Sequence, residues 1–346
     1  MLDPVRIAEI APPWFTVPPA GYGGIELVVA QLTDHLVERG HEVTLYASGG
    51  SSTKAVLVTP LLDAPDPALV GNSWYDAYHA GSSYLDIGND VDVVHDHSGI
   101  AGPTLGALRR GHPPVVHTLH GAWTEPSRRL YQLLADHVHL VAISAAQRAE
   151  FPEIRYAGVV HNGVDIDSYP FAETKDDFLV YIGRSNPDKG PTIAIEVARR
   201  AGLPLAMVVK RTEPFERAYW DEIVAPLLHD EVEVYEGISH EHKVDLLGRA
   251  RAMLFPIQWP EPFGLVMVEA MACGTPVVAC PAGAAVELVE EGVTGYLRDS
   301  IDGLVEAVGM VDGCSPAACR ERVALHFSAE AMVNAYERIY AAVAVP

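Results

Sequence analysis

The sequence predicts an α/β protein of two domains, each with a parallel sheet covered by helices. Three observations carry this prediction. The chain has 346 residues, which exceeds the size at which a single hydrophobic core usually stops growing. Short β-rich apolar runs alternate with amphipathic segments from end to end, which is typical of parallel sheets. The alternation forms two series separated by a polar stretch, which favours two sheets over one.

The first series occupies residues 1–168. Its predicted strands are the runs VRIAEI, EVTLYA, VDVVH, PVVHTLH and LVAIS. The boundary is placed near residue 169, because HNGVDIDSYPFAETKDD combines an Asn-Gly turn signal, a proline and a polar run. The second series occupies residues 169–327, with predicted strands DFLVYIG, LAMVVK, EVEVYEG, AMLFPI and PVVAC. Residues 328–346 are predicted to form a terminal helix that returns to the N-terminal domain.

The composition excludes several classes of protein. Hydrophobic residues make up 49% and charged residues 20%, and no apolar run approaches the ~20 residues of a membrane span. The opening MLDPVRIAEI lacks the basic flank and apolar stretch of a signal peptide, so a cytoplasmic protein is expected. The formal net charge of −22 argues against binding nucleic acid through a broad basic surface. Four cysteines make no disulfide framework, so reduced structural thiols are expected.

A glycine-bearing loop is predicted near the N-terminus. The segment PPAGYGGIELVVAQLTDHLVERG reads as this loop, then a helix, then a stop at Gly40. Backbone N–H groups at the start of the helix suit an anion, and Gly23 and Gly24 would let a phosphate approach the backbone. A tight turn that needs glycine for its dihedral angles explains the loop equally well.

Two cations are predicted at the start of the second domain. In YIGRSNPDKGPTIAIEVARRAG a strand ends at Gly183 and a helix begins near Pro191, with Arg184 and Lys189 in the loop between them. Ligands of open parallel sheets bind at this carboxyl edge. Arginine with its bidentate fork and lysine as a compact charge can hold a diphosphate there. Taken singly, each remains open to interpretation as a solvated surface charge.

The stretch EPFGLVMVE, residues 261 to 269, places two carboxylates in apolar surroundings. Its Pro and Gly predict a loop followed by a buried helix from about Leu265 to Cys273, with Glu261 at the mouth of a site and Glu269 on the helix wall. The helix N-terminus at Phe263 to Leu265 offers backbone N–H groups to phosphate.

The carboxylates also need partners. No Lys or Arg occurs between Arg251 and Arg298, so any salt-bridge partner of Glu269 must come from afar. An unpaired buried charge is too costly, and sugar hydroxyls are donors that suit a carboxylate. Paired carboxylates also fit a glycosidase, but that interpretation leaves Arg184 and Lys189 unexplained.

The Glu261-to-Glu269 spacing is an E-x7-E pattern. Together with GGIE, HTLHG, HNGVD, GRSNPDKG and MACGTPVVA in this order, it resembles the retaining glycosyltransferases of family 4 over essentially the whole chain. The resemblance implies the GT-B architecture, in which two Rossmann-like domains have parallel sheets that face each other across a cleft. The length and the opening APPWFTVPPAGYGG are similar to those of small members from actinomycete antibiotic pathways.

The resemblance implies a reaction. A sugar would pass from a nucleoside diphosphate donor, UDP before GDP, to a hydroxyl of a small or medium-sized soluble acceptor. Anomeric configuration would be retained, no metal would be required, and the sugar nucleotide would be a co-substrate with no further cofactor. A nucleotide-sugar 2-epimerase of the same architecture and a non-catalytic sugar-nucleotide-binding protein remain as alternatives.

The family implies roles for the residues that match its motifs. Glu261 would contact hydroxyls of the donor sugar, His120 would lie beside the reacting carbon, and Arg184 and Lys189 would neutralise the departing diphosphate. Glu269 would hold the ribose hydroxyls, and Ile238 would pack against the base. The strand end that reads G-x-G in many relatives is MVVKRTEP here, which makes Lys210 an extra phosphate or base contact. The donor-binding set is then Gly23, Gly24, Lys210, Ile238, Phe263, Gly264, Leu265 and Glu269.

Other side chains have two interpretations. His95 and His97 in HDHS lie on one side of a strand end, where they either ligate a metal or line the cleft near the acceptor; the second is favoured, and no metal site is predicted. Trp14 either stacks on the acceptor with His97 nearby or covers a loop. The segment HEHK, residues 240 to 243, is predicted to be a solvated helix start.

Overall fold

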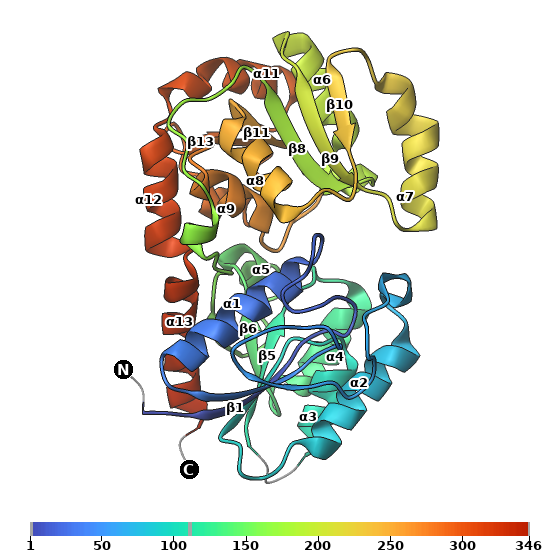
Figure 1. Ribbon diagram of the computed structural model, residues 1–346, viewed down its shortest axis with the longest axis vertical. Helices are drawn as coiled ribbons and strands as arrows, with labels where there is room; N and C mark the ends of the chain where they lie inside the picture. The colour runs from blue at the N-terminus through green and yellow to red at the C-terminus, as the bar shows by residue number, and fades with distance from the viewer. Residues whose placement is uncertain (1–2, 110–112, 345–346) are drawn as a thin grey trace. The chain divides into compact units, whose positions relative to one another are not determined.

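The computed structural model describes residues 3–109 and 113–344, which divide into two compact units (Figure 1). The first unit combines Met1–Gly163 with Ala329–Pro346, and the second is Val164–Ser328. Each unit is a parallel sheet with helices, so the predicted fold class is confirmed. Among the described helices, none is long and apolar enough to cross a membrane.

The first unit contains a seven-stranded sheet in the order β3-β2-β1-β4-β5-β6-β7. β1 pairs in parallel with β2 on one side and with β4 on the other, so the winding of the chain reverses between β1 and β4. This is the topological switch point at which open α/β sheets bind ligands. The strands are β1 Arg6–Ile10, β2 Glu42–Tyr46, β3 Val56–Val58, β4 Val93–Asp96, β5 Val115–Leu119, β6 His139–Ala142 and β7 Tyr156–Val159.

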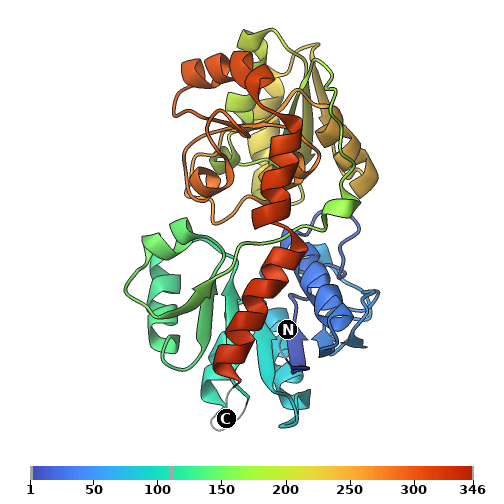
Figure 2. The ribbon, with the colours of Figure 1, turned by 90° about the vertical axis from the view of Figure 1, so that its left-hand side faces the viewer.

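Helices cover this sheet, and the last helix of the chain is one of them. α13 contacts α1, as Figures 1 and 2 show. Its two tyrosines, Tyr336 and Tyr340, are fully buried and reach the sheet. Glu337 on the same helix pairs with Arg39 at 2.7 Å and with His41 at 3.1 Å. The helices are α1 Gly24–Glu38, α2 Ser73–Asp86, α3 Ala101–Leu108, α4 Glu125–Leu134, α5 Ala145–Glu150 and α13 Ala329–Val343, with a 3-10 turn at Pro67–Leu69.

The second unit contains a six-stranded sheet in the order β10-β9-β8-β11-β12-β13. Its switch point lies between β8 and β11, which are parallel neighbours. The strands are β8 Leu179–Arg184, β9 Leu205–Lys210, β10 Val232–Tyr235, β11 Ala252–Phe255, β12 Val277–Ala279 and β13 Gly295–Leu297. The helices are α6 Pro191–Ala201, α7 Pro214–Tyr219, α8 His240–Arg249, α9 Leu265–Ala272, α10 Ala285–Leu288, α11 Ile301–Met310 and α12 Pro316–His326. Short turns of other helix types lie at Ile166–Ser168, Pro187–Lys189, Trp220–Val224, Ala225–Leu227 and Val311–Gly313.

Candidate active site

The switch point of the second sheet brings together the two segments that the sequence analysis singled out. β8 ends at Arg184 and its neighbour β11 ends at Phe255. The loop that follows β8 carries Lys189, and the loop that follows β11 carries Glu261. Cations and carboxylates therefore meet where parallel sheets bind ligands.

The loop after β8 is a tight turn that fixes Lys189. Asn186 caps it, since its side-chain oxygen accepts a hydrogen bond from the backbone N–H of Lys189 at 3.0 Å. Gly190 follows with a φ of 67°, and a β-carbon there would clash with the carbonyl oxygen of Pro256. Glycine is thus required both for the left-handed dihedral and for the close approach of the two loops. α6 begins at Pro191, as predicted.

The loop after β11 is held by its backbone. The carbonyl oxygen of Glu261 accepts a hydrogen bond from the N–H of Ala284 at 2.9 Å. Gly264 has a φ of 87° and turns the chain into α9, which begins at Leu265 and has Cys273 as its C-cap. The predicted loop and helix are therefore confirmed.

Glu261 is held by two donors on one of its oxygens. Its Oε2 accepts from Lys189 Nζ and from the indole Nε1 of Trp259, the latter at 2.8 Å. Lys189 Nζ also lies 5.0 Å from the centroid of the Trp259 ring, which adds a cation–π attraction. The Lys189 and Glu261 side chains are only 16% and 14% exposed to solvent, so water screens this pair weakly.

Glu269 is held in the same way. Its Oε1 accepts from Lys243 Nζ at 2.7 Å and from the Tyr169 hydroxyl at 2.9 Å. The Glu269 side chain is 2% exposed. Lys243 stands 26 residues before Glu269, so the expected distant partner exists. The prediction of a solvated helix start is correct for the cap at Ser239 but wrong for Lys243, whose side chain is only 17% exposed.

Each carboxylate has its described donors on one oxygen only. The protein donors converge on Oε2 of Glu261 and on Oε1 of Glu269. Within residues 3–109 and 113–344, no hydrogen bond reaches the second oxygen of either side chain. The protein itself therefore supplies donors to both carboxylates, so sugar hydroxyls are not needed to offset their burial. An ionised carboxylate has about four acceptor sites, so the second oxygen can still accept from hydroxyls.

The remaining predicted cations lie in an acidic cluster. Arg184 stands 3.5 Å from Glu213 and 3.6 Å from the fully buried Glu216. Lys210 stands 3.6 Å from Glu213. The alternative of a freely solvated charge is wrong for Arg184, whose side chain is 31% exposed and paired.

Three of the predicted donor-binding residues differ in how far their side chains are exposed to solvent. Phe263 is 2% exposed and packs edge-on against Phe327, with ring centroids 6.2 Å apart. Its ring belongs to the core, and the prediction used only its backbone N–H. Leu265 and Ile238 are partly exposed.

A buried carboxyl group lies beside the glycine loop of the first unit, in the first turn of α1. Gly23 is the N-cap of α1 with a φ of 149°, so the turn does require glycine. A β-carbon on Gly23 would lie 3.1 Å from Oε2 of Glu26, which is 3% exposed. Burial raises the pKa of Glu26 to about 7, although its own backbone N–H opposes the shift. An anion at Gly23 and Gly24 would compete with this carboxyl group for the N–H groups of the helix.

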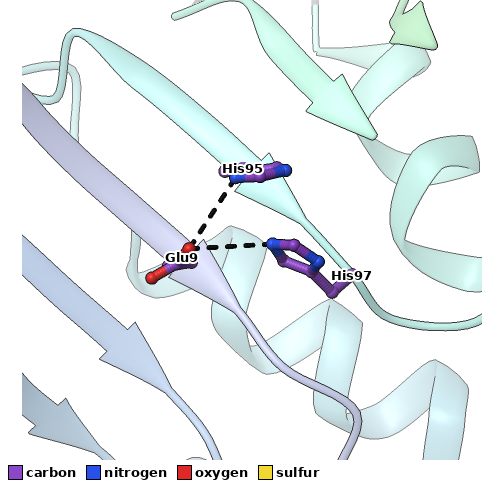
Figure 3. Close-up of side chains that lie close together, drawn as sticks. All are labelled: Glu9, His95 and His97. Carbon is purple, nitrogen blue, oxygen red and sulfur yellow. Dashed lines mark ion pairs between the residues drawn. The ribbon is translucent and has the colours of Figure 1, made fainter. Parts of the chain in front are cut away.

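Figure 3 shows a second cluster, at the switch point of the first sheet. Glu9 on β1 faces two histidines from the end of β4, and all three side chains are buried. Oε1 of Glu9 stands 3.7 Å from His95 Nδ1 and 3.6 Å from His97 Nε2. These ligand atoms lie within 4.8 Å of one another, so Glu9, His95 and His97 are the described residues that could hold a metal ion.

The histidines do not line an open surface, which corrects the sequence interpretation of His95 and His97. His95 is bound at both ring nitrogens, by the Tyr340 hydroxyl at 2.7 Å and the Thr118 hydroxyl at 2.8 Å. His97 Nδ1 lies 2.9 Å from Nε2 of His120, which is partly exposed. Burial, which disfavours the charged imidazolium, lowers the pKa of His120 well below its usual value, and the nearby His97 ring lowers it further.

Sequence reasoning missed five contributors: Glu9, Glu26, Tyr169, Lys243 and Trp259. Glu9 had a signal, because an acid in the middle of the apolar run VRIAEI is unusual for a buried strand. Trp14, predicted at the acceptor, is partly exposed in the loop after β1.

Comparison with known proteins follows the same division of the chain. A family model described as "Glycosyltransferase Family 4" matches residues 22–168, and one described as "Glycosyl transferases group 1" matches residues 166–308. The D-inositol 3-phosphate glycosyltransferase of Mycobacterium sp. (strain KMS) is 28% identical, over 81% of this chain and 75% of its own length. The glycogen synthase of Mycobacterium tuberculosis (strain ATCC 25618 / H37Rv) is 28% identical, over 94% of this chain and 92% of its own.

Solved structures give the same picture. AviGT4, a glycosyltransferase involved in avilamycin A biosynthesis, is 29% identical and superposes with a TM-score of 0.77 over 99% of this chain and 98% of its own. Anabaena Alr3699/HepE in complex with UDP and glucose has a TM-score of 0.72 at 20% identity, over 97% of this chain and 99% of its own. The second likeness concerns the fold alone.

Proposed function

We propose that this chain, which matches the models of glycosyltransferase family 4 and of glycosyl transferases group 1 and has the GT-B architecture, transfers a sugar from a nucleoside diphosphate donor to a hydroxyl of a soluble acceptor. UDP is the proposed nucleotide, ahead of GDP, and the anomeric configuration is retained. The supporting observation is that Lys189 pairs with Glu261 at the switch point of the second sheet, in the loops that follow β8 and β11, where β8 also ends at Arg184. The similarity to AviGT4 supports an acceptor from antibiotic or oligosaccharide biosynthesis.

The charges of the second unit would do most of the chemical work. The bond between the anomeric carbon and the phosphate oxygen breaks as the bond to the acceptor oxygen forms on the same face. The acceptor proton passes to the departing phosphate oxygen. Arg184 and Lys189 stabilise the negative charge that builds on this diphosphate, an electrostatic effect that is commonly the largest in catalysis. The cations fill the role of a metal in this scheme, so activity should survive EDTA.

The carboxylates would orient the donor. The free oxygen of Glu261 accepts hydroxyls of the sugar, and the free oxygen of Glu269 accepts those of the ribose. The backbone N–H groups from Phe263 to Leu265 bind phosphate at the start of α9. In this proposal His120 contacts the sugar, and Trp14 contacts the acceptor.

The variants Arg184→Ala and Lys189→Ala test the proposal. Each should lower kcat roughly 100-fold or more, which is the usual cost of removing one such donor. Arg200→Ala is the matched control, because Arg200 pairs with the exposed Asp302 on the same unit and should matter little. Full activity in both variants would contradict the assignment.

A thermal-shift panel with UDP, GDP, ADP and dTDP tests the nucleotide. The preferred one should raise Tm by mass action, and we expect UDP to give the largest shift. Incubation of the sugar nucleotide without acceptor separates the alternatives. Isomerised donor would indicate a 2-epimerase, and binding without any turnover or slow hydrolysis would indicate a binding protein.

A further inference from the structure

The buried cluster of Glu9, His95 and His97 contains two polar atoms with no hydrogen bond. They are Oε1 of Glu9 and Nε2 of His97, and they face each other at 3.6 Å. Both side chains are fully removed from solvent. Unpartnered buried polar atoms are costly, so a pair that points at one another needs an explanation.

A metal ion is one explanation, but the geometry disfavours it. A metal at this cluster requires a lone pair from Nδ1 of His95, and the Tyr340 hydroxyl already occupies that atom at 2.7 Å. The other nitrogen of His95 is bound to Thr118. Only Glu9 and His97 then remain, and two ligands are fewer than transition-metal sites in proteins use.

The alternative explanation is a proton on Nε2 of His97. A neutral imidazole carries one N–H, so a proton on Nε2 leaves Nδ1 as an acceptor. The proton then points at the Glu9 carboxylate, and no two lone pairs face each other. Thr33 holds the carboxylate from its other side by donating its hydroxyl to Oε2 of Glu9.

This choice fixes the next histidine as well. His97 Nδ1 lies 2.9 Å from His120 Nε2, and since Nδ1 of His97 is the acceptor, His120 must donate from Nε2. Its Nδ1 is left with a lone pair, and within the described residues no hydrogen bond reaches that atom. The partly exposed side chain can present this lone pair to a substrate.

We infer that Glu9 and His97 are positioning residues that set the tautomer of His120, so that its Nδ1 accepts a hydrogen bond from a hydroxyl of the substrate. Glu9, His97 and His120 form a series of side chains that starts on β1 and passes the end of β4 to the end of β5, which are three adjacent strands of the first sheet. The inference rests on the proposed function for its consequence in catalysis, but the tautomer itself can be measured without a substrate.

Side-chain ¹⁵N NMR of the histidines in the full chain tests the tautomer. In the wild type, His97 and His120 should both appear as the Nε2–H form, with His97→Gln and His120→Gln giving the assignments. In Glu9→Met the Nε2–H of His97 no longer faces a carboxylate, so the Nε2–H fraction of His120 should fall. Glu337→Met is the matched control, because Glu337 also faces a histidine, His41, at 3.1 Å in the same unit, and it should leave His120 unchanged.

Kinetics of the same variants test the role. Glu9→Met should lower kcat about 10- to 100-fold, as loss of a group that orients a histidine usually does, with KM for the donor within about twofold. Glu337→Met should keep kcat within about twofold.

Several results would overturn the inference. One is an Nδ1–H form of His120 in the wild type, which decides the matter even if Glu9→Met does not fold. Others are an unchanged spectrum in Glu9→Met, an equal loss of kcat in Glu337→Met, and stoichiometric zinc that Glu9→Met no longer binds. If no sugar transfer is found with any donor, the proposed function fails while the spectra still test the tautomer.

Discussion

The pair of Lys243 and Glu269 offers a quantitative test of how the second unit holds a buried carboxylate. At 2.7 Å, Coulomb's law with an effective dielectric constant of about 20 gives a gross attraction of roughly 6 kcal/mol. Removal of one partner of a buried pair costs about 3–5 kcal/mol in practice. The Lys243 side chain is 17% exposed, and the Tyr169 hydroxyl would still donate to Glu269 in its absence. We therefore expect Lys243→Met to cost about 3 kcal/mol of unfolding free energy, at the low end of this range.

The measurement is native-state hydrogen exchange of the amides of α8 and α9, which reports the second unit by itself. A loss of about 3 kcal/mol corresponds to opening that is roughly 100-fold more frequent. In a Glu269→Gln background the buried charge is gone, so the same substitution should cost less than about 1 kcal/mol. Arg249→Met on the same helix is the control, because Arg249 pairs with Asp176 at an exposed site and should change stability by no more than about 1 kcal/mol. Equal costs of Lys243→Met in both backgrounds would refute the reasoning.

Three further predictions concern single positions. Gly190→Ala should lower Tm and weaken UDP binding at least about tenfold, because the added β-carbon would meet the Pro256 carbonyl. Gly202 also has a positive φ but has open space around it, so Gly202→Ala should lose only about 1 kcal/mol of unfolding free energy from backbone strain. Calorimetry with and without UDP compares the two variants. Burial lowers the pKa of His79 to about 4 from 6.5, so its neutral form contributes stability above pH 6.5 that is lost as pH falls toward 4. In His79→Gln this pH dependence should disappear, so the urea midpoints at pH 5 and at pH 7 should converge. Burial lowers the pKa of Lys175 to about 8 from 10.5, so the free energy of unfolding should rise between pH 8 and 10.5. Lys175→Met should remove that rise and cost about 2 kcal/mol, because Lys175 donates to the backbone carbonyls of Gly248 and Cys273. Urea midpoints measured at high pH check both effects, and a rise with pH that persists in the variant contradicts the assignment.

Most of the strands that could be predicted from sequence lie inside the sheets, and β10 is the one predicted strand that lies at an edge. The ten predicted runs correspond to β1, β2, β4, β5 and β6 in the first unit and β8 to β12 in the second. The strands that were missed, β3, β7 and β13, all lie at sheet edges. An edge strand pairs on one side only and is short, so its sequence need not form a continuous apolar run.

The candidate site was predictable in its positions but not in its partners. Pro and Gly specify turns locally, which is why the loops around Lys189 and Glu261 agree with the prediction. The donors to Glu269 come from 26 and 100 residues away, and nothing in the local pattern connects Lys243 or Tyr169 to it. The proton arrangement of His97 and His120 likewise depends on Glu9, which is more than 85 residues away in sequence and meets them only through strand order.

The paired charges of the second unit bear on which ligand can bind there. Four cations face four carboxylates at its carboxyl edge, so the edge is close to neutral and attracts no anion from a distance in a chain of net charge −22. A pyrophosphate alone would draw the cations away and leave the buried carboxylates without their charged partners, which is costly. A free sugar would satisfy the second oxygens of the carboxylates but would leave the cations as they are. A nucleotide sugar would do both at once, because its diphosphate would take the cations while its hydroxyls would donate to the carboxylates. If the proposed function is right, the pairing should therefore favour the intact donor over either of its parts, because Glu261 and Glu269 would otherwise lose their cationic partners and keep only Trp259 and Tyr169 as donors among the described residues.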